Sequence, residues 1–166
     1  MAIRQMTAGD VGQVEALVKA SFMACVATSL RPAGIQTFFK VASKEALLLR
    51  LQEDNLILVY EEQDVITGMA ELKQGAHLSM LFVLPEWQGK GIARCLLQSL
   101  LPYCRHPELT VRSSLNAVSF YESQGFQKNG GPAELAGLRY QPLSFAVPET
   151  TAPEGRSSSA LSQKSQ

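Results

Sequence analysis

The chain has 166 residues, of which 46% are apolar and 18% are charged, and its formal net charge at pH 7 is zero. This is the composition of an ordinary globular protein, and a chain of this length can bury a core without disulfides or metals. A balanced charge disfavours a large nucleic-acid footprint, which normally needs a basic excess. No apolar run approaches the roughly 20 residues that a membrane span needs.

The cysteines and histidines predict neither a disulfide framework nor a metal site. Cys25, Cys95 and Cys104 are odd in number and form no C-x-x-C pair, which favours free thiols in a reducing compartment. His77 and His106 have no metal-ligand spacing with each other or with the cysteines. The N-terminus lacks the apolar stretch of a secretory signal, so we expect a cytoplasmic protein that contacts neither membrane nor nucleic acid.

The N-terminal third is predicted to contain one strand and two helices. Residues 2–6 alternate weakly, as a short strand does. A capped helix follows, because apolar residues recur at i+3 and i+4 from Val11 to Phe22. Pro32 and Gly34 indicate a break in secondary structure, and a second helix is expected after Ser43.

The middle of the chain changes to the pattern of strands. Residues 55–60, 65–72 and 77–84 are short apolar runs separated by short polar turns, which favours an antiparallel meander. From Ile92 the apolar residues return to helical spacing, and Pro102 should end that helix.

The last part of the chain predicts further strands around one helix. Residues 109–111 form a short strand, and residues 115–124 a helix that Gly125 can close. A strand begins at Phe126 and another spans residues 138–147. Interleaved helices and strands with an antiparallel run indicate an α/β (α+β) fold with a mixed sheet.

The chain is predicted to form one domain over residues 1–147, followed by a tail. Residues 148–166 are rich in Pro, Ser, Thr, Gly and Gln and have almost nothing to bury. We therefore expect this tail to be disordered.

A glycine-rich turn precedes the helix that begins near Ile92. Gly89 and Gly91 would let the backbone approach a bulky partner closely. The first N–H groups of a helix lack internal acceptors and favour a bound anion such as a diphosphate, and Lys90 adds positive charge. An isolated G-x-G is more often a plain turn. Arg94 occupies the place of the third small residue of a Rossmann fingerprint, and a Walker loop does not fit either.

Two motifs in this setting carry a family resemblance. Gln88, Gly91 and Ala93, after a strand ending in V-x-P, match the signature [RQ]-x-x-G-x-[GA]. This resembles the GNAT superfamily of acyl-CoA-dependent N-acyltransferases. Residues 117–126 resemble the family's A-x-x-x-Y-x-x-x-G-F. The resemblance covers residues 2–146 and implies a GNAT-like fold, with a mixed, mostly antiparallel sheet and helices on both faces.

The resemblance implies transfer of an acetyl group from acetyl-CoA directly to a primary amine, with no covalent enzyme intermediate. A backbone N–H near Phe82 or Val83 would then stabilise the oxyanion. Ser114 stands where many members carry an asparagine that contacts the cofactor. The residues expected to bind acetyl-CoA are Leu81, Phe82, Val83, Gln88, Gly89, Lys90, Gly91, Ile92, Ala93, Arg94 and Ser114.

The residues for the catalytic acid and base are less clearly indicated than those for the cofactor. Tyr121 resembles the general acid that protonates the departing thiolate, although a tyrosine there could instead only pack beside the cofactor. Glu71 and His77 flank the turn between two predicted strands, and either could be the general base. Each could equally be structural, and the amine could arrive neutral without any side-chain base.

The acceptor and the assembly stay open at this point. The acceptor would be a small-molecule or peptide amine, and the protein a monomer or a homodimer. Residues 22–42, which in order correspond to the family's acceptor region, are rather apolar, and Arg31 and Lys40 are their only charges. This disfavours strongly cationic acceptors. The alternative function is a non-catalytic acyl-CoA-binding or regulatory module.

Overall fold

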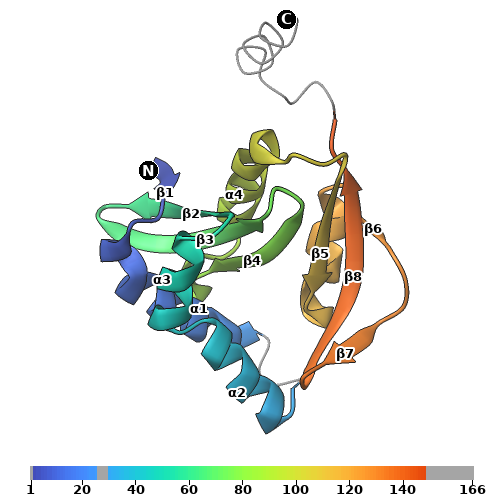
Figure 1. Ribbon diagram of the computed structural model, residues 1–166, viewed down its shortest axis with the longest axis horizontal. Helices are drawn as coiled ribbons and strands as arrows, with labels where there is room; N and C mark the ends of the chain where they lie inside the picture. Colours follow the sequence, from blue (N-terminus) through green and yellow to red (C-terminus); the bar gives the residue numbers. More distant parts are fainter. Residues whose placement is uncertain (1, 26–29, 149–166) are drawn as a thin grey trace, which may run out of the picture.

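The structure is a computed structural model that describes residues 2–25 and 30–148, so all but the first residue of the predicted tail lies outside it (Figure 1). The strands are β1 Ala2–Gln5, β2 Asn55–Glu62, β3 Val65–Lys73, β4 His77–Val83, β5 Glu108–Ser113, β6 Gln127–Lys128, β7 Ala133–Leu135 and β8 Leu138–Ala146. The helices are α1 Val11–Cys25, α2 Pro32–Val41, α3 Lys44–Leu51, α4 Ile92–Leu100 and α5 Val118–Ser123, with short 3₁₀ turns between several of these elements.

The strands form one sheet in the order β1-β2-β3-β4-β5-β8-β6, and β7 pairs with β8. Every neighbouring pair is antiparallel except β4 and β5, which are parallel. The predicted meander is therefore confirmed as β2-β3-β4. The expectation of a mixed, mostly antiparallel sheet is confirmed as well.

Helices cover both faces of the sheet (Figure 1). On one face, side chains of α1, α2 and α3 pack with Ile57, Val59 and Met80 of the strands. On the other face, side chains of α4 and α5 pack with Leu58 and Leu72. Neighbouring residues of β2 thus face opposite layers, as the alternation of a strand requires. Burial on both faces explains why β2 is a nearly continuous apolar run.

The predicted break at Pro32 and Gly34 is instead the start of α2. Pro32 is the first residue of the helix, where its missing N–H has no intrahelical partner to lose and its fixed φ suits the helix. Gly34 packs against the turn between β7 and β8. A Cβ on it would collide with the carbonyl oxygen of Gly137. Pro32 therefore starts α2 and Gly34 permits its close docking, and neither residue interrupts a helix.

Strands β4 and β5 diverge after a short parallel contact. Only His77 and Leu78 of β4 have partners in β5, namely Thr110 and Val111. The remainder of β4 pairs with β3 alone, through a register irregularity next to Glu71. Beyond Leu78, the edge of β4 that faces β5 is therefore unpaired within the described part of the chain. We call this edge the open side of β4. It lies between the helices on the two faces of the sheet.

Among the described residues, no helix has the length and apolar character that crossing a bilayer requires.

Candidate active site

The glycine turn at the start of α4 has the backbone conformation that only glycine adopts easily. Gly89 has a φ of 80° and Gly91 a φ of 84°, and Gly91 is the N-cap of α4. A Cβ at either position would meet no protein atom within 4 Å, so the glycines are required by their φ angles and not by crowding. The turn and the first amides of α4 are thus accessible to a ligand, and they favour an anion.

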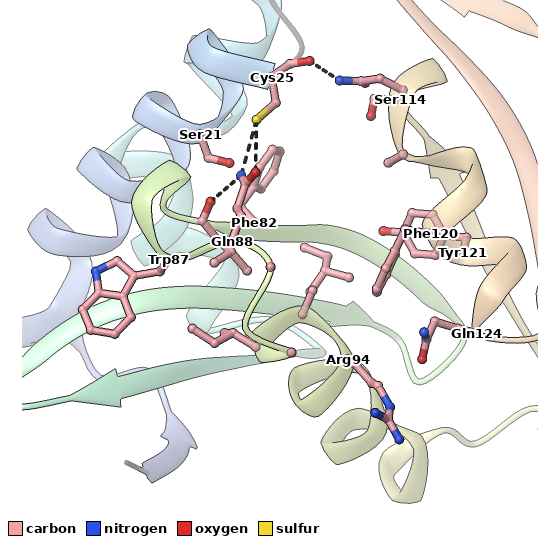
Figure 2. Close-up of a pocket in the computed structure, with 18 residues that line it drawn as sticks. Ser21, Cys25, Phe82, Trp87, Gln88, Arg94, Ser114, Phe120, Tyr121 and Gln124 are labelled. Atoms are coloured by element: carbon pink, nitrogen blue, oxygen red, sulfur yellow. Dashed lines mark hydrogen bonds between the residues drawn. The ribbon is translucent and has the colours of Figure 1, made fainter.

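Gln88 fixes the glycine turn to the end of β4. Its side-chain Nε2 donates to the carbonyl oxygen of Val83 at 3.1 Å. The same nitrogen lies 3.3 Å from Sγ of Cys25 at the end of α1, and Figure 2 shows the Gln88 side chain turned toward this cysteine. The first residue of the GNAT signature therefore holds three elements together around the turn.

The β3–β4 ladder determines which amides of β4 face the open side of the sheet. Leu84 N–H donates to Thr67 O at 2.9 Å, toward β3. Because residues of an antiparallel strand alternate in direction, Phe82 N–H also faces β3. The N–H groups of Leu81 and Val83 face the opposite way. Of the two residues named for the oxyanion, Val83 thus has the suitable direction.

A cavity of about 550 Å³ lies between β4, the glycine turn and α5 (Figure 2). Every residue expected to bind acetyl-CoA lines it except Lys90, which is exposed on the turn. The lining also contains residues that the sequence did not single out for the cofactor: Ser21, Cys25, Trp87, Asn116, Ala117, Phe120 and Gln124. Four lining residues lie at helical spacing in and next to α5: Ala117, Phe120, Tyr121 and Gln124. This spacing is visible in the sequence and could have identified them.

A second cavity, of about 660 Å³, lies next to the first and shares part of its lining. It lies over the start of β4 and is bordered by α2, β5 and β8. The residues that line both cavities are Leu81, Phe82, Ser114, Ala117 and Tyr121. Tyr121 and the open side of β4 therefore border both cavities.

Tyr121 is a buried phenol at the wall of both cavities. Only 6% of the residue is exposed, and the rings of Phe120 and Phe126 lie edge-on to it at 5.2 Å. No hydrogen bond of its hydroxyl is found among residues 2–25 and 30–148. Burial raises the pKa of Tyr121 above its usual value, because desolvation disfavours the phenolate. The hydroxyl therefore stays protonated at neutral pH and is free to donate.

His77 lines the second cavity and is held by Thr110. The Nδ1 atom of His77 lies 2.7 Å from Oγ1 of Thr110, and that hydroxyl in turn lies 3.4 Å from the carbonyl oxygen of Ala76. If the hydroxyl donates to Ala76, it accepts from Nδ1–H, and Nε2 is left with a free lone pair. Burial, followed by the charges of Arg112 and Lys73, lowers the pKa of His77. The imidazole is therefore neutral near pH 7.

Glu71 lies outside both cavities. The residue is fully buried, and its Oε2 is 2.8 Å from Nε of Arg50 on α3. Arg50 also donates to the carbonyl oxygen of Val41. Of the two candidate bases, the structure brings only His77 into the cavity that Tyr121 lines.

No group of three or more His, Cys, Asp or Glu residues in the described part of the chain is arranged to hold a metal ion.

Comparisons with known proteins agree with this arrangement. The family model described as "Acetyltransferase (GNAT) domain" matches residues 26–147. The chain is 32% identical over 71 residues to the peptidyl-lysine N-acetyltransferase YiaC of Escherichia coli (strain K12), which is 41% of this chain and 47% of that protein. It is 35% identical over 79 residues to an uncharacterized acetyltransferase of Streptococcus pyogenes serotype M1, or 44% and 56% of the two chains. The chain thus spans about half the length of the curated relatives it matches.

Solved structures share the fold at low sequence identity. A GCN5-related N-acetyltransferase from Rhodopseudomonas palustris superposes with a TM-score of 0.76 at 22% identity, over 87% of this chain and 94% of that one. The PaiA N-acetyltransferase from Thermoplasma acidophilum, solved in complex with coenzyme A, gives a TM-score of 0.74 at 21% identity, over 87% and 98%. This likeness confirms the expected fold.

Proposed function

This chain belongs to the GNAT acetyltransferase family, and on that premise we propose that it moves an acetyl group from acetyl-CoA directly to a primary amine. The observation that carries the proposal is that two adjacent cavities share Tyr121 and residues of β4 in their linings. One cavity reaches the glycine turn, which suits a diphosphate. The other offers a separate approach for an amine. Two substrates could therefore meet at one point without a covalent enzyme intermediate.

The glycine turn and the first turn of α4 hold the diphosphate of acetyl-CoA in this proposal. Backbone N–H groups supply the hydrogen bonds, and the helix dipole adds favourable electrostatics. Arg94 lies at the start of α4 and lines the cavity (Figure 2), and Lys90 is exposed beside it. Ser114 lines the opposite wall and offers a hydroxyl where many family members have an amide.

Acetyl-CoA supplies the activated thioester, and the residues of β4 position its carbonyl group. The N–H of Leu81 or Val83 faces the open side of the sheet and stabilises the negative charge that develops on the carbonyl oxygen. The carbonyl of Val83 is already engaged by Gln88. This contact holds the strand end in place before the substrates bind.

Tyr121 and His77 divide the proton transfers between them. Tyr121 donates its proton to the leaving thiolate, and its pKa, raised by burial, keeps the phenol protonated until the thiolate departs. His77 accepts the proton of the attacking amine at Nε2, either directly or through a water molecule. Its lowered pKa keeps this atom unprotonated at neutral pH. Glu71 has a structural role in this proposal, as the buried partner of Arg50.

The direct test is release of coenzyme A thiol from acetyl-CoA in the presence of a panel of amines, with thermal unfolding of the protein measured alongside. We expect amine-dependent thiol release, together with stabilisation by coenzyme A. Stabilisation without thiol release for any amine would instead indicate a non-catalytic acyl-CoA-binding module. If neither were seen, the chain would not use acetyl-CoA.

A further inference from the structure

The formally charged side chains that line the second cavity are all cationic. They come from three strands and belong to Lys73, Arg112 and Arg139. No aspartate or glutamate lines the cavity among the residues that the structure describes. Residues 26–29, which precede α2, have the sequence VATS and contain no carboxylate. The proposed acceptor cavity is thus a cationic environment.

The strand registers bring two of these cations to either side of His77. Lys73 pairs with His77 across the β3–β4 hairpin, and His77 pairs with Thr110 across β4–β5. Arg112 lies two residues beyond Thr110 and therefore on the same face of β5. Both charges contribute to lowering the pKa of His77. Lys73 and Arg112 therefore act electrostatically on one region of the cavity.

No ion pair in the part of the chain that the structure describes neutralises these cations. The ion pairs found in the described part of the chain involve none of the three. The guanidinium of Arg112 lies 5.3 Å from the ring centre of Tyr140, which orients it. Glu134 is the cross-strand neighbour of Arg139, but its carboxylate lies 3.8 Å from Arg31. An anion bound in the cavity would offset the mutual repulsion of the cations.

Another part of the second cavity's lining is aromatic. The rings of Phe22 and Phe38 are stacked with centroids 3.9 Å apart, and the ring of Phe82 lies edge-on to Phe38 at 5.5 Å. All three residues line the cavity. A ligand in this cavity would thus meet both cationic groups and an apolar surface.

We propose that the acceptor is an amine that also carries an anionic group and an apolar body, the combination found in an apolar α-amino acid. The proposal rests on the acetyltransferase function above. The cations would attract the anionic group, and Arg112 can bind a carboxylate or a phosphate through two hydrogen bonds. The same cations would disfavour a bound ammonium and so favour the neutral amine that reacts. Polycationic amines would be excluded.

The test compares amines of one shape that differ in charge. Phenylalanine carries the amine, the carboxylate and an aromatic body, whereas phenylalaninamide and phenethylamine lack the anion. The phosphonate analogue of phenylalanine distinguishes the two kinds of anion, and a lysine-containing peptide represents a protein acceptor. We would measure kcat/KM by thiol release, and binding by calorimetry in the presence of coenzyme A. We expect the anionic amines to exceed their neutral counterparts by roughly tenfold or more in both measurements.

Variants of Arg112 test the cavity itself. Arg112→Gln should remove most of this preference by raising KM for the anionic amines only, and Arg112→Lys should retain part of it. Lys128 is exposed on β6 and lines neither cavity, so Lys128→Gln is the matched control. Thermal unfolding of each variant checks the fold. The ratio between phenylalanine and phenylalaninamide would not change if Arg112 only stabilised the strand.

The results of these experiments distinguish the anionic acceptor from the acetyltransferase function on which that proposal rests. Equal or faster acetylation of phenethylamine, phenylalaninamide or the lysine peptide would overturn the inference and leave the acetyltransferase function intact. Equal binding of phenylalanine and phenylalaninamide would overturn it even without turnover. Absence of thiol release with every amine, despite preferential binding of the anionic ones, would support the cavity chemistry and contradict the proposed reaction.

Discussion

His77 and Thr110 are joined by a contact of 2.7 Å between Nδ1 and Oγ1, in the short stretch where β4 and β5 pair. The contact favours the tautomer with the proton on Nδ1, because the hydroxyl has the carbonyl oxygen of Ala76 as its own acceptor. Nε2 has no partner among the described residues, and His77 lines the cavity that Tyr121 also lines. The pairing of β4 with β5 thus places the hydroxyl that favours one tautomer of His77.

The pH dependence of the reaction follows from the lowered pKa of His77. A base must be unprotonated, so kcat/KM should fall as the pH decreases through this pKa, and the acidic limb should lie below the ordinary value of 6.5. His77→Ala should lower activity and remove this limb, whereas Glu71→Gln should retain it. The measurement is a pH–rate profile of the three proteins. Loss of the limb in Glu71→Gln, with its persistence in His77→Ala, would reverse the assignment.

Removal of the Tyr121 hydroxyl should affect turnover without affecting stability. Tyr121→Phe is expected to lower kcat by roughly tenfold or more, because a positioned acid is worth at least that much. The free energy of unfolding should not fall, since the buried hydroxyl has no partner among the described residues to lose. Tyr103→Phe, at a side chain that lines neither cavity, is the control. Unchanged kcat in Tyr121→Phe would remove this residue from the mechanism.

Substitution by alanine should have opposite effects on stability at Gly91, which has a left-handed backbone, and at Gly12, which is helical. Gly91→Ala should destabilise the protein by about 1–2 kcal/mol, because its φ of 84° is strained for alanine. Gly12 lies inside α1, where a Cβ would meet no atom within 4 Å, so Gly12→Ala should stabilise by about 0.5 kcal/mol. Denaturant unfolding measures both. Equal effects at the two sites would contradict the conformation of the turn.

The buried ion pair of Arg50 and Glu71 predicts a large loss of stability when it is broken. Arg50→Met leaves the Glu71 carboxylate buried without its cation, which costs about 3 kcal/mol or more. Arg105 and Asp54 form a comparable pair at the surface, with more than half of each side chain exposed. Arg105→Met should change the free energy of unfolding by less than about 1 kcal/mol. Chemical denaturation of both variants checks the contrast, and similar losses would contradict it.

Local pattern was sufficient to predict the elements that carry the cofactor site. The meander, the helix that begins at Ile92 and the glycine turn follow from apolar spacing and from the φ angles that glycine permits. Helix α2 was missed, because a proline can either start a helix at its first position or end one. The residue type alone does not tell which. Nothing next to Pro32 in the sequence distinguishes the two cases. The difference lies in the contact of Gly34 with Gly137, more than 100 residues away.

The acceptor side of the site could not be predicted, because distant strands assemble it. Glu71 and His77 look equivalent in the sequence, since both flank one turn. Helix α3 covers one of them with Arg50, whereas the divergence of β4 and β5 leaves the other beside a cavity. The cations that line the second cavity come from β3, β5 and β8, and strand pairing brings them together.

In the proposed reaction, the glycine turn holds the diphosphate of acetyl-CoA. The most direct measurement is calorimetric titration of the protein with coenzyme A and with pantetheine, which has the same thiol arm but no diphosphate. We predict much tighter binding of coenzyme A, and a smaller difference in the Gly91→Ala variant. Equal affinity for the two compounds, or an unchanged difference in that variant, would contradict the account.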